Sequence, residues 1–202
     1  MLVSDKDYFV FPEKGGISRD YVPLHNHQMT GINDPELMKD AVDLQASATH
    51  EGDALTVDVT LTNDKTGHSV PTDSPARSMM LVVEALDANG ETLALSQGPL
   101  LPVWTGNYSG QPGKAYAKIL RDDWSGETPT AAYWRPVTIV EDTRLAALAS
   151  DHSTYTFSLP SGRTATVKIR LVYRRSFQQL AEQKGWNDPD IPMAETTIPI
   201  EK

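Results

Sequence analysis

The chain has 202 residues and contains no cysteine. Disulfides, cysteine-ligated zinc, a thiol nucleophile and a C-x-x-C-H attachment site are therefore excluded within it. Long hydrophobic runs are also lacking, and no stretch approaches the roughly 18 apolar residues that a membrane span needs. Basic clusters are lacking too, since 18 Lys and Arg stand against 27 Asp and Glu, for a net charge of -9. We therefore expect neither a membrane span nor nucleic-acid binding.

The composition is that of a chain that buries a core, with 39% hydrophobic and 22% charged residues. Residues 1–34 are punctuated by proline and glycine and show no lasting periodicity, which predicts an extended N-terminal arm. Residues 35–202 are expected to form the main domain. Charged residues interrupt Met1–Phe11, so these residues do not resemble a signal peptide. Either the chain stays in the cytoplasm or a leader has been removed.

Alternation of apolar and polar residues predicts several short strands in the main domain. They are 44–48, 54–62, 77–86, 92–95, 154–159, 164–174 and 194–200. Turn residues between consecutive runs predict hairpins at 50–53, 87–91 and 160–162. Asp34 and Pro35 predict the start of a short helix, and Gly185 the end of another over 177–184. This pattern is typical of a mainly β, antiparallel immunoglobulin-like β-sandwich.

A long segment, 99–136, departs from this pattern and is expected to form an irregular insertion. It is rich in Trp and Tyr, and its candidate ligand- or partner-binding residues are Trp104, Tyr108, Trp124 and Trp134. Such rings could stack on sugars or form a protein-docking surface. They could equally cover the edge of the sandwich as a satellite core, and we favour that interpretation.

Three histidines are candidate metal ligands. His68 lies in a run in which Gly67 permits a tight turn, and a histidine held there could ligate a metal. It could also be a structural residue that bonds backbone. His25 and His27, two apart on the arm, could bind a transition metal if a third ligand approached, or could remain solvated.

Two of these runs resemble motifs of multihaem c-type cytochromes. His27-Gln28-Met29-Thr30-Gly31 looks like their His-x-Phe-x-Gly element, with Met29 in place of the phenylalanine. The strand ending at Asn63, followed by Gly67-His68-Ser69-Val70-Pro71-Thr72 and Arg77, is similar to their N…GHxxPTG…R segment. Asp73 stands where that pattern often has glycine. The resemblance covers most of residues 25–200, although each motif is short.

The resemblance implies a β-sandwich that follows a haem-bearing region rich in C-x-x-C-H motifs. It implies a periplasmic or extracellular location, partners that include the upstream haem-bearing domain and redox proteins, and His27 as the distal axial ligand of an upstream haem. His25 and His68 are weaker candidates for that role. Because this chain has no cysteine, it binds no haem covalently, and haem c is expected only in a longer parent protein. Residues 1–34 would then be the remnant of the haem-bearing region.

No catalytic motif is present: we find no Gly-x-Ser-x-Gly elbow, phosphate loop, dinucleotide fingerprint or zinc helix. The acidic runs 87–91 and 187–190 could offer oxygens to calcium, but they lack the twelve-residue spacing and are more simply turns. The leading hypothesis is a non-catalytic scaffold and docking domain of a multihaem cytochrome. The alternative is a free-standing carbohydrate- or protein-binding module that uses the aromatic insertion. A hydrolase with an unrecognised site is a third, weaker possibility.

Overall fold

The computed structural model describes residues 3–6, 12–16, 23–25, 31–72 and 74–201. The chain divides into two compact units, Met1–Leu37 and Met38–Lys202. In the first unit, β1 (Val3–Lys6) pairs antiparallel with β2 (Pro23–His25), and a short 3-10 helix, η1, covers Pro12–Lys14. The predicted helix near Asp34 is α1 (Pro35–Asp40). Its cap is confirmed, because Asp34 Oδ1 accepts the backbone N–H of Glu36 at 3.0 Å.

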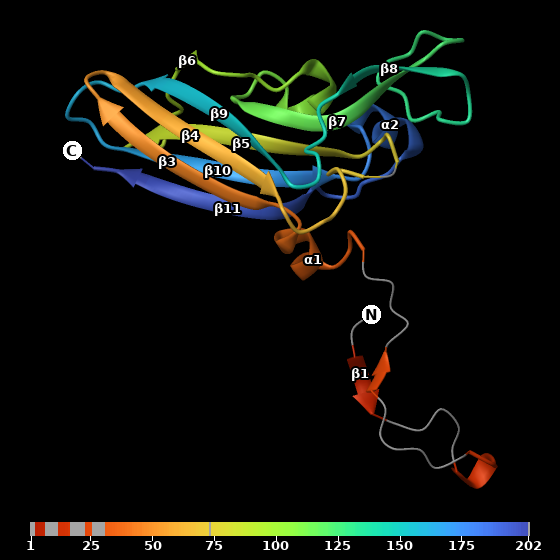
Figure 1. Cartoon of the computed structure of the whole chain (residues 1–202). Helices are drawn as coiled ribbons and strands as arrows, with labels where there is room; N and C mark the ends of the chain where they lie inside the picture. The colour runs from red at the N-terminus through yellow and green to blue at the C-terminus, as the bar shows by residue number, and fades with distance from the viewer. Residues whose placement is uncertain (1–2, 7–11, 17–22, 26–30, 73, 202) are drawn as a thin grey trace. The chain divides into compact units, whose positions relative to one another are not determined.

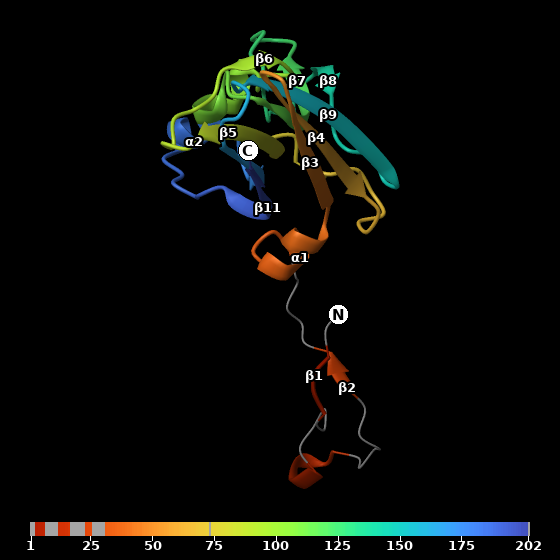
Figure 2. The same cartoon turned by 90° about the vertical axis from the view of Figure 1, so that its left-hand side faces the viewer.

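The described part of the second unit forms two antiparallel sheets that face each other (Figures 1 and 2). One sheet has the strand order β11-β10-β5-β7-β8, and the other has the order β3-β4-β9-β6. The strands are β3 (Asp43–Glu51), β4 (Ala54–Asn63), β5 (Ser78–Asp87), β6 (Leu95–Gln97), β7 (Gly113–Asp122), β8 (Val137–Asp142), β9 (Ala149–Ser158), β10 (Ala165–Arg174) and β11 (Ile191–Ile200). The predicted mainly β, antiparallel sandwich is confirmed.

The core lies between the sheets and follows the period of two that a half-buried strand requires. On β4 the inward residues Leu55, Val57, Val59 and Leu61 are at most 1% exposed, and their neighbours are polar. The central strand β5 is buried on both faces, so 79–83 form a continuous apolar run. Each such large side chain contributes about 1.5–3 kcal/mol through burial. The two sheets are therefore held together mainly by apolar packing.

The expected irregular insertion over 99–136 needs correction, because β7 lies in its middle and pairs with β5 and β8. The strand β7 was missed since it is buried on both faces for most of its length and therefore does not alternate. The remainder of the segment consists of the 3-10 helix η2 (Val103–Tyr108), the short loops on either side of it and the loop that joins β7 to β8.

One predicted hairpin is wrong, and another is shorter than expected. The turn at 160–162 connects β9 to β10, but β9 pairs with β4 and β6, whereas β10 pairs with β5 and β11. This turn therefore crosses from one sheet to the other. After β5, Thr92 returns only as an isolated bridge to Leu86, and β6 then joins β9 in the opposite sheet. Periodicity predicts that a strand exists but does not say which sheet it joins.

The second predicted helix is α2 (Gln178–Lys184), and it ends as expected at Gly185, whose φ is 68°. The N–H of Trp186 closes the cap by donating to the Ala181 carbonyl oxygen at 2.9 Å. None of the helices in the described ranges has the length and apolar character needed to cross a membrane.

Candidate functional site

The three candidate histidines fall in different parts of the chain. His27 lies outside the described residues, and His25 is the last residue of β2 in the first unit. His68 belongs to the second unit, where its ring is exposed and its Nδ1 lies 3.1 Å from the Ser69 carbonyl oxygen. Among the described residues, no group of three or more His, Cys, Asp or Glu side chains could hold a metal ion. The axial-ligand assignments stay predictions.

The loop that carries His68 is fixed by Asn63, the last residue of β4. The Asn63 side chain is fully buried, and its Nδ2 lies within hydrogen-bonding distance of three carbonyl oxygens, those of His68 at 2.7 Å, Leu145 at 3.0 Å and Ala146 at 3.1 Å. Gly67 turns this loop at a φ of 70°, in the left-handed region that favours glycine. Asn63 and Gly67 in the cytochrome-like motif are thus structural residues that tie this loop to the segment after β8.

Half of the aromatic residues singled out in 99–136 pack against the sandwich. The half-buried Trp104 lies edge-on to the buried Phe177, with ring centroids 5.7 Å apart. Tyr108 packs against the cluster of Met80, Val82 and Leu101, among other residues. These two rings join η2 to the five-stranded sheet and to α2, so they act as a satellite core.

The other two candidates point into solvent from the loop between β7 and β8. Trp124 is 73% exposed and Trp134 is 71% exposed. Tyr133, 67% exposed, stands edge-on to Trp134 with centroids 5.4 Å apart, and the Arg135 guanidinium lies 5.8 Å from the Trp124 ring centroid. Tyr and Trp are enriched at binding interfaces, where one part of the ring is apolar and the other can bond to a polar partner. This aromatic loop (123–136) is therefore a candidate binding surface.

A single buried carboxylate holds the aromatic loop. Asp122, at the end of β7, is 1% exposed, and its Oδ1 accepts the backbone N–H of Trp124 at 2.8 Å. Its Oδ2 accepts from Arg135 Nη1 at 3.0 Å. The Trp124 N–H, together with the Arg135 side chain, holds the pKa of the Asp122 carboxyl below its usual range. The rings are thus presented on an ordered loop.

A second ordered cluster surrounds Arg174, the last residue of β10. Its Nε and Nη2 donate to the two carboxylate oxygens of Asp190, both at 2.8 Å. Nη1 donates to the Thr105 carbonyl oxygen at 2.7 Å, and Nη2 donates to Asn107 Oδ1 at 2.6 Å. The guanidinium also lies over the Tyr108 ring, 5.3 Å from its centroid. Arg174 therefore joins β10, η2 and the segment that leads into β11.

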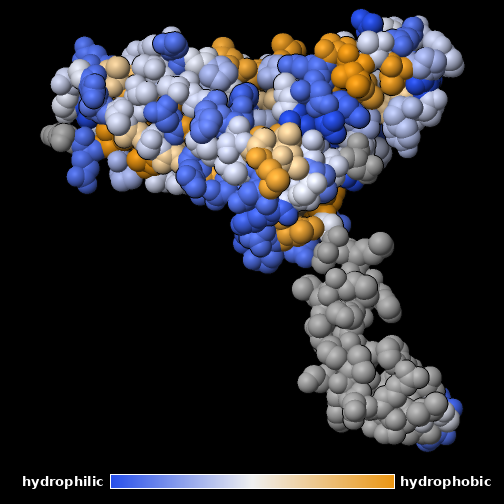
Figure 3. All heavy atoms as spheres, viewed as in Figure 1, coloured by the Kyte–Doolittle hydropathy of each residue, from blue (hydrophilic) through white to orange (hydrophobic). Residues whose placement is uncertain are grey.

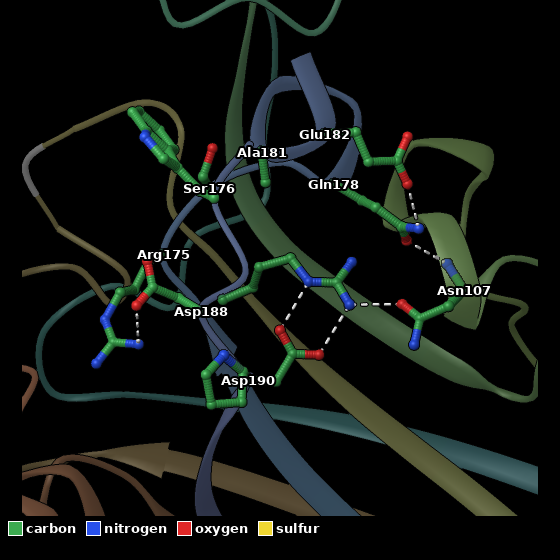
Figure 4. Close-up of a pocket in the computed structure, with 11 residues that line it drawn as sticks. Asn107, Arg175, Ser176, Gln178, Ala181, Glu182, Asp188 and Asp190 are labelled. Atoms are coloured by element: carbon green, nitrogen blue, oxygen red, sulfur yellow. Dashed lines mark hydrogen bonds and ion pairs between the residues drawn. The ribbon is translucent and has the colours of Figure 1, made fainter. Parts of the chain in front are cut away.

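This cluster lines a pocket of about 630 Å³ between the end of β10, η2 and α2 (Figure 4). Glu182 and Asp188 line it together with Arg175, whose Nη1 lies 3.7 Å from Asp188 Oδ1. Burial, followed by the charge of Asp190, raises the pKa of the nearby Tyr108 hydroxyl. The described residues that line the pocket carry both signs of charge and include no histidine, so they can bind a polar group but offer no imidazole base.

Sequence reasoning missed the pairing of Arg174 with Asp190 and the roles of Tyr133 and Arg135. An arginine that directly follows the apolar run 171–173 at the end of a strand is a detectable signal, because such a residue needs partners where it is buried. Its acidic partner lies beyond a helix and a loop, so chain distance does not identify it. For Arg135 the signal was its position directly after Tyr133 and Trp134 and before an apolar run.

No protein-family model matches the chain, and no curated protein matches it. The structure is similar to that of a penta-heme cytochrome c552 from Thermochromatium tepidum, with a TM-score of 0.66 and 22% sequence identity. What the two share is the fold. The match covers 86% of this chain and 43% of that chain, so this chain spans less than half of the cytochrome. A PapD-like domain of human CEP192 (PapD-like domain 7) has a TM-score of 0.32 at 9% identity, which is too remote to carry an argument.

Proposed function

We propose that this chain is the non-catalytic β-sandwich domain of a multihaem c-type cytochrome and serves as a scaffold and docking surface in electron transfer. The observation that carries the proposal is the similarity of its fold to part of the penta-heme cytochrome chain. The cytochrome-like motifs around His27 and His68 support it independently. A c-type cytochrome is assembled outside the cytoplasm, so the proposed location is periplasmic or extracellular.

The side chains present in this chain fit the role of an axial haem ligand but not that of a covalent attachment site. Covalent attachment needs thiols, and the chain has none. An imidazole can supply an axial ligand to a haem that another segment holds, and in this proposal His27 has that role. His25 and His68 are secondary candidates. The exposed His68 ring is reachable from outside the sandwich, while Asn63 fixes the backbone beneath it.

The test is a pyridine haemochrome spectrum of the full-length gene product purified from its source. The proposal expects a c-type haem signal, and in that protein His27→Ala should convert one haem from a low-spin to a high-spin spectrum. The matched control is His152→Ala, because His152 is an exposed histidine on β9 that hydrogen-bonds Thr60. Absence of haem would reject the cytochrome assignment. Haem with an unchanged spin state in His27→Ala would reject only the ligand.

A second candidate function is a free-standing module that binds carbohydrate or protein through the aromatic loop. The observation that favours it is the exposure of Trp124, Tyr133 and Trp134 on a loop held by Asp122. In this case a ligand should quench tryptophan fluorescence, and Trp124→Ala and Trp134→Ala should each reduce the response. Trp186→Ala is the control, since Trp186 is 51% exposed but lines the pocket beside Arg174 and is not part of the aromatic loop. Equal binding by all variants would reject this function.

A further inference from the structure

The four edge strands of the sandwich differ in how far each could pair with another chain. In the five-stranded sheet the edge strand β11 contains Pro192 and Pro199, which have no N–H to donate. It also packs beside β3, the edge strand of the other sheet, and Figure 1 shows the two side by side. The other edge strand of the four-stranded sheet, β6, has only three residues. Three of the four edges are thus covered, short or interrupted.

The remaining edge, β8, is twice as long as β6, and no strand of the described residues pairs with its outer side. Its sequence, VTIVED, has no proline, glycine or lysine, and five of its six residues are exposed. Ile139 is 58% exposed and Val140 is 54% exposed, although β-branched apolar residues are those that pair well in sheets. Figure 3 shows hydrophobic residues gathered on the surface at this end of the sandwich. An uncovered edge with this composition is a template for strand pairing.

A groove adjoins β8 on the side of η2 and α2. Its volume is about 500 Å³, and its apolar lining includes Val140, Val103 and the buried Phe177. Val140 is the extra residue of a bulge opposite Ile119 and Leu120, and such a bulge redirects a side chain out of the regular ladder. The groove therefore offers an apolar side chain a place directly beside the free edge.

The charged residues that line the groove are both acidic. They are Glu141 and Glu182, and the lining residues that the structure describes include no lysine or arginine. The adjacent Asp142 is already paired, through Arg144 Nη2 at 2.7 Å from its Oδ2. An anionic rim around an apolar lining favours a segment that carries both apolar and cationic side chains.

We infer that the β8 edge and its groove form a strand-addition site for an extended segment of another protein, in which apolar residues alternate with lysine or arginine. The backbone of that segment pairs with β8, one apolar side chain enters the groove beside Val140, and a neighbouring cation faces Glu141 or Glu182. A second copy of this chain is a poorer occupant, because it brings another acidic edge and another net charge of -9. The inference needs no haem and is independent of the proposed function.

The experiment titrates the isotope-labelled 202-residue chain with three synthetic heptapeptides and follows the backbone amide NMR signals. The probes are KVKVKVK, its acidic counterpart EVEVEVE, and KSKSKSK, which keeps the charge but removes the valines. The site predicts that KVKVKVK binds, shifts the amides of β8 and of the groove, and slows amide hydrogen exchange along 137–142. It predicts at least tenfold weaker binding for the other two peptides.

Two substitutions and a matched control locate the site. Val140→Lys adds a charge to the edge and removes the groove contact, and should weaken binding of KVKVKVK by about tenfold or more. Glu141→Lys should shift the preference toward EVEVEVE. Leu148→Lys is the control, because Leu148 is an 82% exposed apolar residue outside β8 and the groove, and it should leave binding unchanged.

Several outcomes would overturn the inference. They are equal binding of KVKVKVK and EVEVEVE, amide shifts confined to another part of the chain, or no binding by any peptide. Concentration-dependent dimerisation that Val140→Lys abolishes would also overturn it, because the occupant would then be a second copy. Circular dichroism shows whether each variant is still folded, so that weaker binding by a folded variant can be assigned to the site.

Discussion

Asp122 and Arg135 are joined across the base of the aromatic loop, with Asp122 Oδ2 accepting from Arg135 Nη1 at 3.0 Å. The Asp122 side chain is 1% exposed, whereas that of Arg135 is 43% exposed. The same carboxylate also accepts the backbone N–H groups of Trp124 and Ser125. One buried charge therefore fixes both ends of a loop that presents Trp124 and Trp134 to solvent.

The role of this carboxylate makes the loop dependent on pH. Because hydrogen bonds from Trp124 N–H and Arg135 lower the pKa of Asp122 in the folded chain, its charged form favours the folded state. This contribution is fully present above the unfolded pKa of about 3.9 and is lost as pH falls through the lower, folded value. Asp122→Asn should unfold at a lower temperature than the wild type at pH 6, and the difference should shrink as pH falls toward 2.

Thermal unfolding followed by circular dichroism at several pH values measures this difference. Asp64→Asn is the matched control, because Asp64 is an exposed aspartate in the loop after β4. Its difference from the wild type should be small at every pH. A constant difference for Asp122→Asn across pH 2–6 would contradict the assigned role of the charge.

The buried ion pair of Arg174 predicts a large effect on stability. The Arg174 side chain is 10% exposed, and all of its nitrogen atoms donate to protein acceptors. Arg174→Met leaves Asp190 charged in a half-buried site and removes the donor to Thr105. We expect a loss of about 3–5 kcal/mol in the free energy of unfolding, measured by urea titration.

Arg170→Met on the same strand is the control. The Arg170–Glu84 pair is one-third exposed on both sides, with 3.3 Å between Nη2 and Oε2. Such an exposed pair contributes about 0–1 kcal/mol. Equal losses for the two variants would show that Arg174 contributes only a surface ion pair.

The sequence was sufficient for features that depend on local chemistry. The cap at Asp34, the left-handed stop at Gly185 and the alternation along β4 depend on neighbouring residues, and the structure confirms all three. The assignment of β9 and β10 to different sheets depends on pairing with distant strands, and adjacent turns do not encode it. The strand β7 was missed because burial on both faces removes the period of two.

The candidate site was only partly accessible from sequence for a related reason. The aromatic content of 99–136 was visible, but which rings pack inward depends on which strand lies beneath them. Trp104 meets Phe177, far along the chain, whereas Trp124 lies on a loop beyond the end of β7. Exposure is therefore a property of the completed sandwich.

Replacing a packed tryptophan and replacing an exposed one should change the free energy of unfolding by different amounts. Trp104 packs against the buried cluster around Met80 and Val82 and against Phe177, so Trp104→Ala should lower the free energy of unfolding by about 2–4 kcal/mol. Trp124 is 73% exposed, and Trp124→Ala should change stability by no more than about 0.5 kcal/mol. Urea unfolding measures both variants. A large loss for Trp124→Ala would make that ring part of the fold rather than a candidate binding surface.

Two buried tyrosines between the sheets give a matched pair. Tyr116 donates its hydroxyl to Asp151 Oδ2 at 2.7 Å, while the buried Tyr155 hydroxyl has no hydrogen-bond partner in the part of the chain that the structure describes. Tyr116→Phe should therefore destabilise the fold by about 1–2 kcal/mol, because Asp151 loses a donor. Tyr155→Phe removes an unpaired polar group and should be neutral or stabilising by about 1 kcal/mol.

The same pair makes the fold sensitive to alkali. Burial raises the pKa of Tyr155 to about 12, and burial together with Asp151 raises the pKa of Tyr116. A raised pKa favours the neutral hydroxyl in the folded state, so this stability is present below pH 10 and is lost as pH rises above it. Absorbance at 295 nm should show the two buried tyrosines ionising only above pH 10, together with unfolding. In Tyr155→Phe that late step should be smaller. An unchanged late step in this variant would mean that Tyr155 already ionises in the folded chain.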